Sequence, residues 1–230
     1  MRRILSLIVA AGLAVSVIAL APPAGAQTGD VAATCAARLE GNDAHGKAAN
    51  LATMNKVLAS APASLLPQIT ALRDAYQKQG EKLFNSPDGF ALLGAVDSWV
   101  YDNCPGTQVP VTAIDYEFQG MPATLKPGFT NFKLTNAAPK EDHMLTFQKL
   151  NAKGETIDLD KLLAMPEKKS NQYFEQTGGA FMYAPAGQVA YGPANLTPGK
   201  YVYACFVQQG GKKNGKPHFM LGMKGEFTVQ

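Results

Sequence analysis

The stretch YVYACFVQQGGKKNGKPHFMLGMKGEFTV, residues 201–229, carries the strongest pattern in the chain. Its first residues alternate, so the two tyrosines and Cys205 share one face of a predicted strand. A loop rich in glycine and lysine then leads to His218 and Met223, and a second strand-like run follows. The stretch therefore predicts two β-strands whose connecting loop carries side chains that bind soft metals.

The same two-residue periodicity extends through the C-terminal half of the chain. Four further alternating runs lie between glycine, proline and asparagine turns: VTAIDYEF (111–118), NFKLTN (131–136), HMLTF (143–147) and GEFTV (225–229). IDLDKLLAM (157–165) predicts a short helix, and AYGPANLTPGK (190–200) predicts a cluster of turns. Short strands at regular spacing predict a β-sandwich over residues 108–230.

The preceding part of the chain, residues 27–107, has helical periodicity instead. Apolar residues recur at three- and four-residue steps, and the run SPD at residues 86–88 is a typical helix start. Cys35 lies in the first helical segment and Cys104 directly follows the last. A disulfide between them would clamp the ends of a small helical bundle. The predicted fold class is therefore α+β in two domains, a helical bundle followed by a sandwich.

The N-terminus has the features of a secretory signal peptide. Two arginines precede an almost wholly apolar run over residues 4–21, and Ala24-Gly25-Ala26 has the small-x-small pattern of a cleavage site. An uncleaved membrane anchor is the alternative, since the run is near the lower length limit for a membrane span. We expect cleavage near Ala26 and a secreted, periplasmic or cell-envelope protein. No other segment is long and apolar enough to span a membrane.

The net charge and the number of cysteines limit the classes of function and the disulfides that the chain can have. Removal of residues 1–26 takes two of the 21 basic residues away, so 19 remain against 18 acidic ones. A net charge near zero argues against nucleic-acid binding, which needs a basic surface. Export predicts an oxidising compartment, in which cysteines tend to pair. The chain has three cysteines, so three pairings are open, and a Cys35–Cys104 bridge leaves Cys205 as the odd one.

Three motifs resemble the cupredoxins, the family of plastocyanin and azurin. The run G-x-Y-x-Y-x-C (199–205) is similar to the plastocyanin strand that leads to the copper cysteine, and HFMLGMKGEFTV (218–229) resembles the plastocyanin ending. LTNAAPKEDHMLTF (134–147) is similar to the asparagine-containing turn that ends in the family's first histidine. The resemblance covers about residues 108–230 and not the helical half. It implies a Greek-key sandwich for the C-terminal domain.

The resemblance also implies one type 1 copper ion as cofactor. His143, Cys205 and His218 would be its equatorial ligands, and the Met223 sulfur would sit weakly on the axis. Such a site supports single-electron transfer with a protein redox partner, or copper handling. The Lys212-Lys213 pair beside it could steer an acidic partner. We expect no catalytic residues, and a copper oxidoreductase is less favoured because the sequence offers a single site.

One departure from the family keeps an alternative open. Twelve residues separate Cys205 from His218, which is longer than the usual loop. The alternative is a metal-free interaction or cell-envelope module, in which Cys205 is an inert buried thiol and His143 a core histidine. Met220 competes for the axial position. His45, in a polar turn of the helical half, is expected to be solvated and not a ligand.

Overall fold

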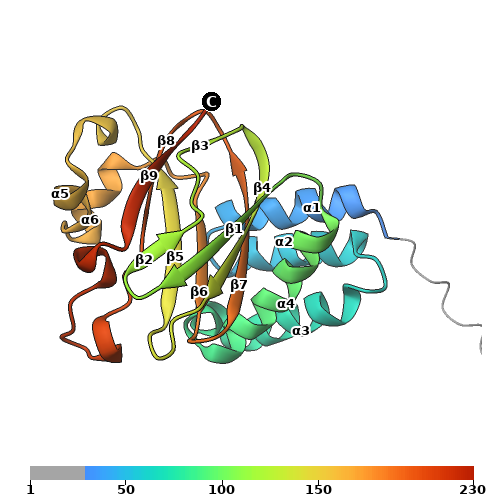
Figure 1. Ribbon diagram of the computed structural model, residues 1–230. Coiled ribbons are helices and arrows are strands. Elements are labelled where there is room, and N and C mark those ends of the chain that lie inside the picture. Colours follow the sequence, from blue (N-terminus) through green and yellow to red (C-terminus); the bar gives the residue numbers. More distant parts are fainter. Residues whose placement is uncertain (1–28) are drawn as a thin grey trace, which may run out of the picture.

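The computed structural model describes residues 29–230, in which a group of helices precedes a β-sandwich (Figure 1). The predicted signal peptide, residues 1–26, lies outside the described residues. Between residues 29 and 230, none of the helices combines the length and the apolar character needed to cross a bilayer. The two parts follow the order that the sequence periodicity predicts.

Four α-helices form the N-terminal part: α1 (Val31–Glu40), α2 (Lys47–Ser60), α3 (Leu66–Gln79) and α4 (Pro87–Asn103). The predicted start of α4 is confirmed, because the Ser86 hydroxyl accepts a hydrogen bond from the Gly89 N–H at 3.1 Å. The apolar stripes of the helices face one another around fully buried side chains that include Ile69, Leu72 and Tyr76. A helical bundle is therefore formed as expected.

The predicted disulfide is present. Cys35 of α1 and Cys104, at the end of α4, are bonded with their Cα atoms 5.8 Å apart. The bridge is buried against Val100, and Phe129 of the sandwich packs on the same cluster. It therefore lies where the bundle meets the sandwich, and it links the first helix of the bundle to the end of the last.

Removing this bridge is expected to destabilise the protein by about 2–4 kcal/mol, because the cross-link restricts the unfolded chain over a separation of 69 residues. The double variant Cys35→Ala/Cys104→Ala is compared with wild type by urea unfolding. Reductant should lower the midpoint of wild type and leave that of the variant unchanged. A variant with the wild-type midpoint would contradict the expectation.

Two sheets form the sandwich. The first has the order β2-β1-β4-β7 and the second the order β3-β9-β8-β5-β6. The first comprises β1 (Thr107–Ile114), β2 (Glu117–Gln119), β4 (Gly128–Asn136) and β7 (Val189–Leu196). The second comprises β3 (Thr124–Leu125), β5 (His143–Lys149), β6 (Ala180–Ala184), β8 (Gly199–Ala204) and β9 (Lys224–Val229). The pairs β1/β4 and β3/β9 are parallel and the other pairs are antiparallel, which makes this a mixed sandwich.

The outer faces of the sandwich are covered on two sides (Figure 1). Helix α4 packs on β4 and β7, where the rings of Tyr101 and Tyr191 are 5.4 Å apart. The second sheet is covered by residues 150–174, which include α5 (Leu159–Leu163) and α6 (Glu167–Ser170). Between the sheets, aromatic side chains such as Phe132, Phe147 and Phe227 form the core.

The prediction of turns over residues 190–200 was wrong for most of that stretch, which forms strand β7. Gly192 occurs there because a Cβ would lie 2.8 Å from the Met182 side chain. Pro193 is tolerated because β7 is the last strand of its sheet, where a missing N–H costs little. The glycine and proline that suggested turns therefore mark close packing and a sheet edge.

Candidate metal centre

Three of the predicted ligands meet at one end of the sandwich. The Nδ1 atoms of His143 and His218 are 3.1 Å apart, and the Cys205 sulfur lies 3.9 Å from the first and 3.5 Å from the second. All three side chains are fully buried. Within residues 29–230 they form the one group of histidine, cysteine or carboxylate side chains with donor atoms close enough to hold a metal ion.

Neighbouring strands bring His143 and Cys205 together. His143 is the first residue of β5, and Cys205 directly follows β8, its antiparallel neighbour. The alternation predicted for β8 is confirmed, since Tyr201 and Cys205 both face the core and Tyr203 packs against it. The Met144 N–H donates to the Cys205 sulfur over 3.4 Å. An N–H directed at the sulfur favours the thiolate form that a metal requires.

The loop of residues 206–217 places His218 beside Cys205. The His218 N–H donates to the Val207 carbonyl at 2.9 Å, and the next amide, that of Phe219, donates to the Cys205 carbonyl at 2.8 Å. Farther out, the Gln209 N–H donates to the Lys216 carbonyl at 3.0 Å. These bonds join the two ends of the loop formed by residues 206–217. The extra residues of this loop therefore form an excursion away from the cluster, and His218 stays beside Cys205.

Met223 is bonded through its backbone to Cys205 and His218, while its role as an axial ligand stays a prediction. Its carbonyl accepts a hydrogen bond from the Cys205 N–H at 3.0 Å, and its own N–H donates to the His218 carbonyl at 3.1 Å. The side chain is fully buried in the same core cluster as Cys205, whereas the competing Met220 is 56% exposed. His45 is exposed in the helical part and is not a member of the cluster.

Burial sets the protonation of the three donors. Burial and, after it, the neighbouring His218 lower the pKa of His143 to about 4. Burial also lowers the pKa of His218, although Glu141 opposes this shift. Both imidazoles are therefore neutral at pH 7 and offer a nitrogen lone pair. Burial raises the pKa of the Cys205 thiol to about 11, so a metal must displace the thiol proton when it binds.

The donor set fits copper. Two neutral imidazoles and a thiol, buried beside a methionine, are the ligand types of a trigonal His2Cys copper site with a weak axial thioether. The Nδ1 atoms of both histidines face each other and the Cys205 sulfur, and the Nε2 atoms are buried and lack a hydrogen bond within the described residues. Unpaired buried polar atoms are costly in a protein interior and often mark a functional site.

Two residues near the cluster were not assigned a role from the sequence. The Asn136 side-chain amide donates to the Glu141 carbonyl at 2.8 Å and to the Ala184 carbonyl at 2.9 Å, which holds the turn before His143. Glu141 itself lies with its Oε2 atom 3.6 Å from His218 Nε2. The sequence contained the asparagine turn as a signal, but it had no feature to show that Glu141 would face the second histidine.

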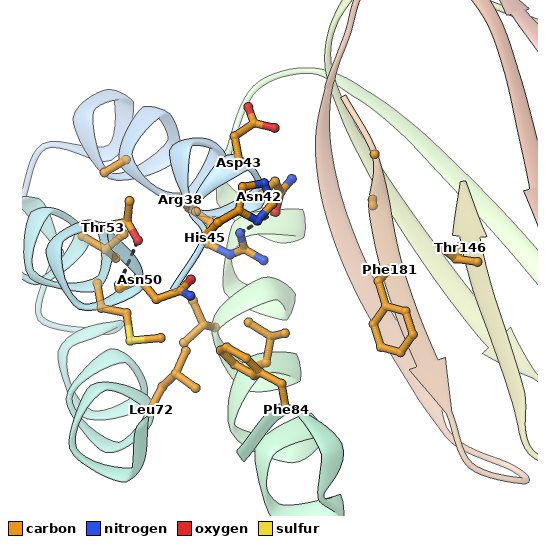
Figure 2. Close-up of a pocket in the computed structure, with 18 of the residues that line it drawn as sticks. Arg38, Asn42, Asp43, His45, Asn50, Thr53, Leu72, Phe84, Thr146 and Phe181 are labelled. Atoms are coloured by element: carbon orange, nitrogen blue, oxygen red, sulfur yellow. Dashed lines mark hydrogen bonds between the residues drawn. The ribbon is translucent and has the colours of Figure 1, made fainter. Parts of the chain in front are cut away.

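A separate cavity of about 420 Å³ lies between the helices and strands β5 and β6. Figure 2 shows Arg38 and Asn50 on its helical side and Thr146 and Phe181 on the strands opposite. Arg38 is paired with Asp97, and Asn50 donates to Tyr76. None of the buried unpaired side-chain atoms in the described part of the chain belongs to a residue of its lining.

Comparison with known proteins gives structural matches alone. No family model and no curated protein sequence matches the chain. Dithionite-reduced auracyanin from the photosynthetic bacterium Roseiflexus castenholzii is 16% identical over 54% of this chain and 98% of that chain, with a TM-score of 0.36. An azurin from Methylomonas sp. strain J is 15% identical over 55% and 99%, with a TM-score of 0.33. Auracyanin A from Chloroflexus aurantiacus, described as a "blue" copper protein, is 17% identical over 53% and 99%, with a TM-score of 0.32.

These structural neighbours are auracyanins and an azurin, which are cupredoxins, the family that the motifs of the C-terminal half resemble. Each match covers little more than half of this chain and nearly all of the other. The functional assignment therefore rests on the side chains of the site.

Proposed function

We propose that this chain is a cupredoxin-like copper protein that transfers single electrons or handles copper. The observation that carries the proposal is the cluster of His143, Cys205 and His218, whose donor atoms all lie within 4.8 Å of one another in a buried position. One thiolate and two imidazoles match the ligand preference of copper. The proposed site would hold one type 1 copper ion, with these three residues and Met223 as its ligands.

Bound copper supplies reversible one-electron chemistry between Cu(I) and Cu(II) at such a site. The residues of this chain hold the donor atoms rigidly and keep them away from water. His143 and Cys205 are attached to adjacent strands of one sheet, and His218 is tied by its N–H to Val207. Full burial of the donors excludes water and limits their rearrangement between the two oxidation states. Small rearrangement favours fast electron transfer.

The proposal includes export and a protein partner. The Cys35–Cys104 disulfide supports export, because disulfides persist in oxidising compartments. Lys212 and Lys213 are both exposed on the excursion of residues 206–217, close in the chain to the donors. A pair of exposed cations there favours an acidic redox partner, which it would attract by electrostatic steering.

Copper loading tests the proposed function. The purified protein is treated with Cu(II), freed of excess metal, and analysed for metal content and visible absorption. We expect one copper per chain and an intense visible band from the thiolate–copper bond. Loading with Zn(II), which takes the same ligand types but has no redox chemistry, is the colourless control. A colourless, metal-free product would overturn the proposal and favour the metal-free module.

A further inference from the structure

The side of His218 that faces away from Cys205 is covered by a carboxylate. His218 Nε2 lies 3.6 Å from Glu141 Oε2, and the His218 side chain has no exposed surface while that of Glu141 is 18% exposed. Nε2 is buried and makes no hydrogen bond at normal length within residues 29–230. If Nε2 carries the ring proton, a small movement of either side chain would bring the N–H within hydrogen-bond distance of the carboxylate.

Glu141 is held in this position from two directions. The Gly210 N–H donates to both of its carboxylate oxygens at 3.0 Å, and the Asn136 amide donates to its backbone carbonyl. Hydrogen bonds from backbone N–H groups to a carboxylate are among the stronger ones in proteins. Gly210 belongs to the excursion of residues 206–217, so the extra length of this loop supplies the donor that fixes Glu141.

The same excursion fixes a second neighbour of His218. The Gln209 side-chain amide donates to the Tyr116 hydroxyl at 2.9 Å, and the Tyr116 ring meets the His218 ring edge-on with centroids 4.9 Å apart. Tyr116 has a φ of 62°, the one positive value at a non-glycine residue within the described part of the chain. Such a conformation is unfavourable for a tyrosine and persists where surrounding contacts impose it, often at functional sites.

We propose that Glu141 is a positioning residue for the metal ligand His218. Its carboxylate accepts the Nε2–H of the imidazole, which leaves the Nδ1 lone pair for the metal, and it places a negative charge next to the site. The inference rests on the proposed function. Metal-binding histidines generally donate their second ring N–H to a carboxylate or carbonyl, which fixes the ring and raises its basicity. The negative charge stabilises Cu(II) more than Cu(I).

The test compares Cu(II) and Cu(I) dissociation constants and the reduction potential in wild type, Glu141→Gln and Asp115→Asn. Glu141→Gln keeps an oxygen that can accept from Gly210 and removes the charge. We expect its Cu(II) affinity to fall about 10- to 100-fold. Its Cu(I) affinity should fall less, so the potential should rise. Asp115 is the matched control, an exposed carboxylate that acts on both histidines through space alone. Its variant should change all three quantities less.

A second readout needs no copper. In the metal-free protein, ¹⁵N NMR of the imidazole should place the His218 proton on Nε2 in wild type. In Glu141→Ala, which removes the acceptor, the proton should be shared between the two ring nitrogens, with the fold checked by circular dichroism. Equal behaviour of the Glu141 and Asp115 variants, with an unchanged tautomer, overturns the inference alone. A wild-type protein that binds no copper overturns the proposed function as well.

Discussion

The Cys205→Ala variant is expected to lose the visible band completely and to retain its fold. In the proposed copper site the Cys205 thiolate would give the intense absorption, and no other cysteine of the chain can replace it. Cys35 and Cys104 are bonded to each other, which leaves Cys205 as the one free cysteine. Visible absorption after Cu(II) loading and copper content per chain are the two measurements.

The fold should survive because the substitution removes one buried sulfur atom and leaves both strands intact. Deleting a single buried heavy atom from a core costs about 1 kcal/mol. Val111→Ala is the matched control, since Val111 is buried in the same core cluster but is not a ligand candidate. It removes two buried carbon atoms, so it should lose at least as much stability as Cys205→Ala and keep the band. A band that survives in Cys205→Ala, or disappears equally in Val111→Ala, would contradict the assigned role of the sulfur.

The elements that the sequence predicts correctly are those with a local signal. The alternation of Tyr201, Tyr203 and Cys205 predicts a strand with one buried face, and strand β8 has that face. The serine–proline start of α4 is also local, because the Ser86 hydroxyl caps a helix that begins at the next residue. The disulfide follows from the same periodicity, which places its cysteines at the two ends of the helical part.

The features that the sequence does not predict depend on contacts between residues far apart in the chain. Glu141 and Asp142 are adjacent acidic residues in one turn, and their sequence context does not separate them. In the structure Asp142 accepts from the Tyr183 hydroxyl at 2.5 Å and from the Ala186 N–H at 3.0 Å. Glu141 instead accepts from Gly210, which lies 69 residues farther along the chain. These distant partners determine which of the two carboxylates faces His218.

The Arg38→Met variant is expected to lose about 3–5 kcal/mol of unfolding free energy at pH 7, because it leaves a buried carboxylate without its cation. Arg38 Nε and Nη2 donate to the two oxygens of Asp97 at 2.6 and 2.8 Å. The Asp97 side chain is only 1% exposed. Arg38 also donates to Asn42, whose amide donates to the Pro193 carbonyl of β7. The pair thus connects α1 with α4 and, through Asn42, with the sandwich.

The pH dependence identifies the cause of this loss. Burial raises the pKa of Asp97 and Arg38 opposes that shift, so removal of Arg38 raises the pKa further. A carboxyl whose pKa is higher in the folded state than in the unfolded state destabilises the fold as pH rises through that window. The deficit of Arg38→Met against wild type should therefore shrink when urea unfolding is repeated at lower pH, within the range where wild type stays folded.

Two further variants separate the buried charge from lost packing. In Arg38→Met/Asp97→Asn no charge remains to be desolvated, so this double variant should recover part of the stability and should lose the pH-dependent deficit. Lys56→Met breaks the pair with Glu40, in which both side chains are more than half exposed, and should cost less than about 1 kcal/mol. If Arg38→Met and the double variant lost equal stability at every pH, the deficit would come from packing, and the buried Asp97 charge would have no part in it.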